Sequence, residues 1–232
     1  MLVTESKPIE EILGFLEGAT KIFLAVCNGC PDACKTGGKE GMEKMQEQLE
    51  KHNKSVVGAT IIDMMCNKTL DWVKISRSMH KVNEADSILV LSCGVGVQAI
   101  GKVIDKPVHP GLNTISVGGL VGLWPSEERC AACGECVLSY TGGICPITTC
   151  AKSLLNGPCG GTTMEGKCEI DSERDCGWYL IYERLRKIGR LDNFRKIVGA
   201  RDFSKVIPSA ELRKTIFYDV EQVESKRCVN PD

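Results

Sequence analysis

The sequence predicts an α/β protein with an N-terminal open parallel sheet and flanking helices, followed by a smaller cysteine-rich, metal-bound domain and a C-terminal helix and tail. Over residues 1–125, short runs rich in β-branched residues alternate with amphipathic helical stretches, and strands separated by helices pair in parallel through right-handed crossovers. Beyond them, eight of the fourteen cysteines lie between residues 130 and 176. We therefore expect an α/β domain over 1–125, a cysteine-rich domain over 126–203 and a docking tail over 204–232.

The strands and helices of the first domain follow from the apolar pattern. KIFLAVC is a compact apolar run that suits a buried strand, whereas KEGMEKMQEQLEKHN places its methionines and leucine at helical spacing with charges opposite. By the same criteria, we predict strands over 21–27, 55–66, 86–93 and 113–119. We predict helices over 7–18, 39–53, 68–85 and 94–105. Glycines and a proline in GGLVGLWPSEE then break the pattern and place the domain boundary near residue 125.

Composition and charge limit the classes of function. An apolar fraction of 43% and a net charge of −1 are ordinary for a globular protein, and they give no electrostatic reason to expect a nucleic acid or an anionic membrane as partner. No apolar run approaches the roughly 18 residues of a membrane-spanning helix, and acidic residues stand where a signal peptide would have a basic start and an apolar run. We expect a cytoplasmic protein, in which metal binding is a better use of these thiols than disulfides.

Three cysteines each occupy the last position of a predicted strand: Cys27, Cys66 and Cys93. In a parallel sheet these positions share one edge, where ligands bind. Cys30, in the CNGC loop after the first strand, adds a fourth thiol, and four thiolates are what a [4Fe–4S] cluster requires. Cys34 is a spare or replaces Cys30. The alternative is that these cysteines are small buried hydrophobic residues, as free cysteine often is.

The same loop allows a second interpretation. GCPDACKT resembles the phosphate-binding pattern G-x-x-x-x-G-K-[ST], but Cys34 stands where the second glycine belongs. That glycine permits a close phosphate approach that a Cβ opposes. The glycines of GVGVQAIG also depart from the dinucleotide-binding spacing. A nucleotide- or corrinoid-binding domain is therefore kept only as an alternative.

The second cluster of cysteines begins with C-x2-C-x2-C, a spacing that lets one loop supply three ligands to a cubane cluster. Zinc competes, because four-cysteine zinc sites also use C-x2-C pairs. None of the three histidines lies in this region, and eight thiols divide into two four-thiolate sites. The eight are Cys130, Cys133, Cys136, Cys145, Cys150, Cys159, Cys168 and Cys176. Their connecting loops are short and glycine-rich, so metal binding should drive the folding of this region, while Cys228 in the tail is expected to be unliganded.

Several of these motifs resemble a known family. CAACGEC, NGPCGG and DCGWYLIYERL resemble the cysteine-rich C-terminal segment of methylenetetrahydrofolate reductase, a segment described as zinc-binding. Together with CNGCPDACKTGG, they make the chain similar to the small-subunit family, MetV, of the acetogen-type enzyme. The resemblance implies an iron–sulfur subunit that passes electrons to the flavin of a separate, MetF-like barrel subunit. That partner reduces methylene-tetrahydrofolate to methyl-tetrahydrofolate in the reductive acetyl-CoA (Wood–Ljungdahl) pathway.

This resemblance implies a division of labour. With 232 residues, the chain is too short for a (β/α)8 barrel plus the cysteine region, so the catalytic half must be another polypeptide and no catalytic residue is expected here. The electron donor would be ferredoxin or another redox subunit. We expect one [4Fe–4S] cluster on Cys27, Cys30, Cys66 and Cys93, and a second on Cys130, Cys133, Cys136 and one later cysteine. The remaining four would hold zinc or another cluster, and the alternative is a zinc-stabilised scaffold subunit without a redox role.

Overall fold

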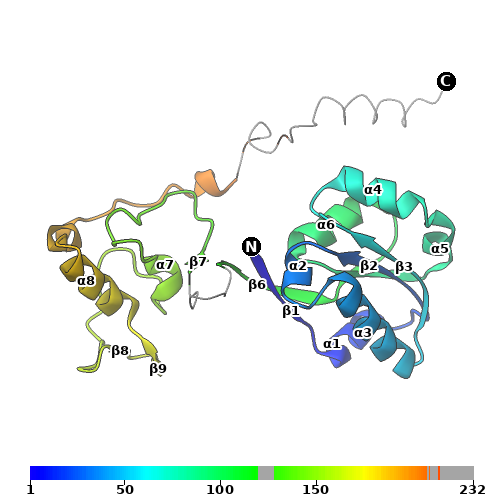
Figure 1. The fold of residues 1–232 in the computed structure, drawn as a ribbon, viewed down its shortest axis with the longest axis horizontal. Coiled ribbons are helices and arrows are strands. Elements are labelled where there is room, and N and C mark those ends of the chain that lie inside the picture. Colours follow the sequence, from blue (N-terminus) through cyan, green and yellow to red (C-terminus); the bar gives the residue numbers. More distant parts are fainter. Residues whose placement is uncertain (120–127, 208, 210–213, 215–232) are drawn as a thin grey trace. The chain divides into compact units, whose positions relative to one another are not determined.

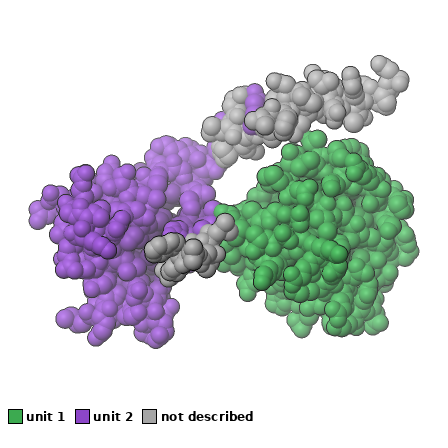
Figure 2. Space-filling view, viewed as in Figure 1, with its two compact units in different colours: residues 1–116 green, residues 117–232 purple. Residues whose placement is uncertain are grey.

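The computed structural model of the chain describes residues 1–119, 128–207, 209 and 214. The chain divides into two units, Met1–Ser116 and Val117–Asp232, which Figure 2 colours separately. The domain boundary expected near residue 125 lies outside the described residues, as does most of the tail predicted over 204–232. None of the helices in the described part of the chain is long and apolar enough to cross a membrane.

A four-stranded parallel sheet forms the centre of the first unit, so the predicted α/β class is confirmed (Figure 1). Its strands, in spatial order, are β3 (Ser55–Ile62), β2 (Lys21–Cys27), β4 (Ser87–Leu91) and β5 (Val108–Pro110). Because β2 is the first of these four strands along the chain but lies between β3 and β4, the strand order reverses beside it. Ligands of open parallel sheets bind at such a point, outside the carboxyl ends of the strands.

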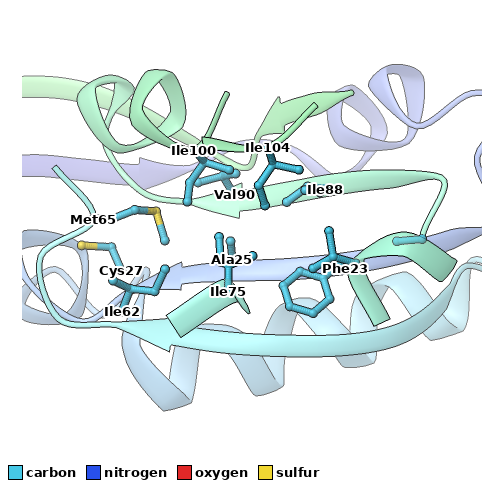
Figure 3. Close-up of a cluster of buried hydrophobic side chains, with 12 residues drawn as sticks. Phe23, Ala25, Cys27, Ile62, Met65, Ile75, Ile88, Val90, Ile100 and Ile104 are labelled. Atoms are coloured by element: carbon cyan, nitrogen blue, oxygen red, sulfur yellow. The ribbon is translucent and has the colours of Figure 1, made fainter. Parts of the chain in front are cut away.

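Helices cover both faces of this sheet (Figure 1). One face packs against α1 (Ile9–Phe15) and α3 (Gly38–Lys51), and the other against α4 (Lys68–Ser76), α5 (Met79–Glu84) and α6 (Gly94–Val103). Side chains alternate along β2 as strand geometry requires, with Ile22, Leu24 and Val26 on the α1/α3 face and Phe23, Ala25 and Cys27 on the other. Figure 3 shows the second of these clusters, in which the Cys27 thiol lies at the end nearest Met65.

Some elements differ from the prediction. The predicted strand 113–119 does not extend the main sheet; β6 (Leu112–Gly118) instead joins β1 (Leu2–Ser6) and β7 (Arg129–Cys130) in a separate three-stranded sheet. The physical reason is that the middle of β6 is exposed, whereas a central parallel strand must be apolar on both faces. The strand predicted over 55–66 ends at Ile62, and the helix predicted over 68–85 is interrupted between α4 and α5.

The second unit contains little regular structure. Its elements are β7, α7 (Pro146–Thr149), β8 (Lys167–Cys168), β9 (Asp171–Asp175), α8 (Gly177–Lys187), η1 (Leu191–Arg195) and η2 (Phe203–Val206). The strands β8 and β9 form an antiparallel hairpin. The buried cluster of this unit consists of Cys176, Trp178, Ile181 and Leu185, which is small for so many residues. Apolar packing alone therefore contributes little to its stability.

Candidate metal-binding sites

Four cysteines of the first unit lie at the carboxyl end of the parallel sheet. Cys27 ends β2 and is buried, and Cys30 begins the short helix α2 (Cys30–Ala33) that follows. Cys93 is the buried N-cap residue of α6, two residues beyond β4. Cys66 lies in the turn after β3 and is exposed. The turns after three neighbouring strands thus bring all four to one edge, as the sequence predicted.

The thiols of this set influence one another electrostatically. Burial raises the pKa of the Cys66 thiol, and the negative charges of Cys27, Cys93 and Cys30 raise that pKa further. Four thiolates that repel one another in this way need a shared cation to ionise together. Cys34 is separate from the set: its Sγ faces the backbone oxygen of Leu2, 3.8 Å away.

Glycine and asparagine position the loop that carries Cys27 and Cys30. A Cβ at Gly29 would stand 3.0 Å from the backbone oxygen of Asp63 and 3.6 Å from the Cys27 Sγ, so the chain between the two cysteines passes close to the loop after β3. Asn28 Nδ2 donates to Asp63 Oδ1 at 3.2 Å and ties the same two loops together. Cys27 at the end of β2 and the turn after β3, which carries Cys66, are thereby held at the same edge of the sheet.

The second unit brings Cys145 to the C-x2-C-x2-C loop. Cys130 lies on β7, Cys145 is the N-cap residue of α7, and Thr148 Oγ1 donates to the Arg129 backbone oxygen at 3.0 Å. Cys130 and Cys145 line one pocket of about 520 Å³. Of the later cysteines, Cys145 thus shares a pocket with the first cysteine of the C-x2-C-x2-C loop.

The other four cysteines line a second, much smaller pocket, with space of about 10 Å³, enough for one water-sized species. They come from the end of α7, the NGPCGG loop, the hairpin strand β8 and the N-cap of α8. These residues are Cys150, Cys159, Cys168 and Cys176. Four separate segments thus present one thiol each to a space of the size of a single ion.

Polar groups already contact two of these thiols. The Gly161 backbone N–H donates to Cys159 Sγ at 3.5 Å, and Thr162 Oγ1 lies 3.1 Å from Cys176 Sγ in a hydrogen bond. Lys152 forms an ion pair with Glu169 and also hydrogen-bonds Cys159; these contacts raise the pKa of Lys152, with Glu169 the larger cause. Hydrogen bonds of this kind orient metal ligands and stabilise the thiolate form. Sequence analysis did not single out Lys152 or Thr162, because their role depends on spatial neighbours.

The donor chemistry of the three sets fits a metal. Each set offers four soft sulfur ligands, the number that zinc and [4Fe–4S] clusters use. Within residues 1–119, 128–207, 209 and 214, no group of three or more Cys, His, Asp or Glu side chains is already arranged to hold a metal ion. The thirteen described cysteines are free thiols, and Cys228 lies outside the described residues.

Comparison with known proteins gives one family match, over part of the chain. Residues 109–204 match the family described as "Methylene-tetrahydrofolate reductase C terminal". No curated protein matches the chain. A solved structure titled "Crystal structure of arylmalonate decarboxylase" is similar at 14% identity and a TM-score of 0.31, with 43% of this chain and 46% of that chain covered. The chain thus spans less than half of that protein, and so low a score supports no argument. The matched residues 109–204 carry all eight cysteines of the second cluster, so the similarity to the methylene-tetrahydrofolate reductase C-terminal family includes the whole of that cluster.

Proposed function

We propose that this chain is the iron–sulfur electron-transfer subunit of a methylenetetrahydrofolate reductase complex. It would pass electrons to the flavin of a separate barrel subunit that reduces methylene-tetrahydrofolate to methyl-tetrahydrofolate. The observation that carries the proposal is the placement of Cys27, Cys30, Cys66 and Cys93 at or after the carboxyl ends of the neighbouring strands β2, β3 and β4. The family of residues 109–204 supports the association with the reductase.

The residues of the first unit would hold and shield a cluster. Such a cluster supplies one-electron chemistry, which a flavin converts to the two-electron reduction of folate. Cys27 and Cys93 are each 6% exposed, so they would hold the inner side of the cluster away from water. Cys66 is exposed and leaves the outer side accessible to a partner. The sheet and its helices keep Cys27 in place because β2, which carries it, contributes buried side chains to the apolar clusters on both faces.

The second unit would hold two further centres. We assign a second [4Fe–4S] cluster to Cys130, Cys133, Cys136 and Cys145, beside the 520 Å³ pocket. We assign a zinc ion to Cys150, Cys159, Cys168 and Cys176, because the space that they share is small. A four-thiolate zinc site has no open coordination position, and its role is structural.

Metal analysis of the anaerobically purified protein tests this proposal. We expect iron and sulfide equivalent to two four-iron clusters, one zinc, and a broad visible absorption that bleaches with dithionite. Cys66→Ser should remove the iron of one cluster, whereas Cys34→Ser, which alters the neighbouring cysteine outside the set, should leave the iron content unchanged. A protein that contains zinc and no iron would contradict electron transfer and support the scaffold alternative.

The assignment of the eight cysteines is tested separately. Cys145→Ser should lower the iron content without changing zinc, and Cys159→Ser should lower zinc without changing iron, because the two residues line different pockets. Inductively coupled plasma mass spectrometry of the two variants measures both metals at once. Loss of the same metal from both variants would show that the eight thiols are divided differently.

Gly177 provides a test that leaves every thiol in place. A Cβ at this position would stand 2.7 Å from the Cys150 backbone nitrogen and 3.1 Å from its Cα, so Gly177 lets the start of α8 approach the end of α7. We expect Gly177→Ala to separate Cys176 from Cys150 and to weaken zinc affinity by about tenfold or more. Competition with a chromophoric chelator measures this affinity. Gly199→Ala is the matched control, since a Cβ there meets nothing within 4 Å; equal affinities of the two variants would refute this role of Gly177.

A further inference from the structure

The chain that follows α8 returns to cover the C-x2-C-x2-C loop. Asp202 N donates to Glu135 Oε2 at 3.1 Å, and Lys205 forms an ion pair with Glu135. Gly134 has φ +78°, and a Cβ there would stand 2.8 Å from the Cβ of Lys205. We call residues 201–206 the strap. Its backbone and side chains lie directly on the loop between Cys133 and Cys136.

The strap carries a cation to a ligand thiol. Arg201 Nη2 lies 3.5 Å from the Glu135 backbone oxygen and donates to it. Cys133 Sγ donates to the same oxygen, also at 3.5 Å. The guanidinium and the Cys133 thiol therefore meet at one carbonyl group of the ligand loop.

One donor of Arg201 has no acceptor. Its Nε is buried, and no hydrogen-bond partner lies near it in the described structure. A buried N–H without an acceptor costs about 1–3 kcal/mol, and more for a charged group. Such a donor beside a set of cluster ligands is suited to an additional anionic acceptor, and the sulfides and thiolates of an iron–sulfur cluster are acceptors of this kind.

We propose that Arg201 is a positioning residue that hydrogen-bonds the cluster held by Cys130, Cys133, Cys136 and Cys145 and thereby raises its reduction potential. This inference rests on the proposed function. A cluster with four thiolates carries net negative charge, and reduction adds one more. A partly buried cation therefore stabilises the reduced form more than the oxidised form, and hydrogen bonds to the sulfurs act in the same direction. Arginine suits this position because its fork can serve Cys133, the Glu135 backbone and a further acceptor together.

The strap determines where the guanidinium lies. Glu135 receives the Asp202 backbone N–H and the Lys205 ammonium on its two carboxylate oxygens. Because Glu135 belongs to the C-x2-C-x2-C loop itself, these bonds join the strap to the ligand loop and keep Arg201 beside Cys133.

Potentiometric titration of the anaerobic complex, followed by electron paramagnetic resonance, tests the proposal. We expect Arg201→Gln to keep its iron and sulfide but to shift the ratio of reduced to oxidised cluster at least tenfold toward oxidised. For a one-electron couple, this corresponds to about 59 mV. Only one of the two cluster potentials should change. In Arg201→Lys, which keeps the charge, that potential should lie between those of wild type and Arg201→Gln. Arg195→Gln, which removes an exposed arginine of η1, should match wild type.

The outcomes separate this inference from the proposed function. Unchanged potentials in an iron-replete Arg201→Gln protein would overturn the role of Arg201 and leave the electron-transfer function standing. If Arg201→Gln fails to retain iron, the reduction potential of Arg201→Lys tests the inference instead. A wild-type potential in Arg201→Lys would overturn the role of the guanidinium. Wild-type protein without iron would overturn the proposed function itself.

Discussion

Removal of iron and zinc is expected to unfold residues 130–176 while the first unit keeps its secondary structure. Within its described residues, the second unit buries one small apolar cluster of four residues, and its strands β7 and β8 are two residues long. The first unit buries two larger clusters, one on each face of its sheet. Structural metal sites supply about 10–16 kcal/mol of binding free energy, which equals or exceeds the whole stability of a typical domain. Without metal, the second unit therefore lacks most of what holds it folded.

Hydrogen–deuterium exchange measures this difference directly. We expect amides of residues 130–176 to exchange at rates close to those of an unfolded chain after anaerobic chelation, and amides of β2 and β4 to remain protected. The control is the same protein before chelation, in which both units should be protected. Persistent protection of 130–176 after metal analysis has confirmed removal would show that packing, not metal, stabilises this unit.

Replacement of Asp71 by leucine is expected to stabilise the first unit at pH 8. Asp71 lies in the first turn of α4 on the same side as Ile75, and it is completely buried. Neither carboxylate oxygen has a hydrogen-bond partner in the described structure. Burial raises the pKa of Asp71 from 3.8 to about 7. The folded unit therefore carries a charge at pH 8 that its interior does not compensate.

Proton linkage gives the direction in which the stability of the first unit changes with pH. Between pH 4 and pH 7, folded Asp71 binds more protons than unfolded Asp71, so the free energy of unfolding falls as pH rises through this range. A pKa difference of about three units corresponds to about 4 kcal/mol, lost by pH 8 and regained below pH 4. Asp71→Leu should remove this pH dependence and be more stable by up to about this amount at pH 8.

Urea unfolding of the first unit at pH 5 and pH 8, followed by pulsed exchange of β2 amides, measures the effect. Asp105→Leu, which alters an exposed acid, is the matched control and should change stability by less than about 0.5 kcal/mol. If Asp71→Leu loses stability between pH 5 and pH 8 as wild type does, the carboxylate is not the source of the pH dependence.

The fold was predictable where strands are buried on both faces. β2 and β4 are almost entirely buried apolar runs, and such runs indicate central parallel strands. β3, at the edge of the sheet, was predictable from its β-branched residues instead. β5 escaped prediction because it has three half-buried residues and ends in proline, which leaves no recognisable pattern. β1 also escaped prediction, because its short sequence has no recognisable strand pattern. The separate sheet of β1, β6 and β7 depends on pairing between distant segments, which local periodicity does not report.

The arrangement of the cysteines was likewise predictable in one part of the chain and not in the other. The convergence of Cys27, Cys30, Cys66 and Cys93 was predictable because parallel topology places strand ends at one edge, whatever the loops do. The division of the other eight cysteines was not predictable, since it depends on where α7, the β8–β9 hairpin and α8 return in space.

The sequence by itself determined the α/β class with cysteines near the ends of parallel strands, and a second cysteine cluster without histidine; that these thiols bind metal in groups of four stays a prediction. Only the tertiary structure decided that Cys145 lines the same pocket as Cys130, that Arg201 and Cys133 bond the same Glu135 backbone oxygen, and that the Asp71 carboxylate is buried without a hydrogen-bond partner in the described structure. The reason is that residue type and periodicity are local properties of a chain. Contacts between segments separated by tens of residues depend instead on how the loops close and on how the whole chain packs.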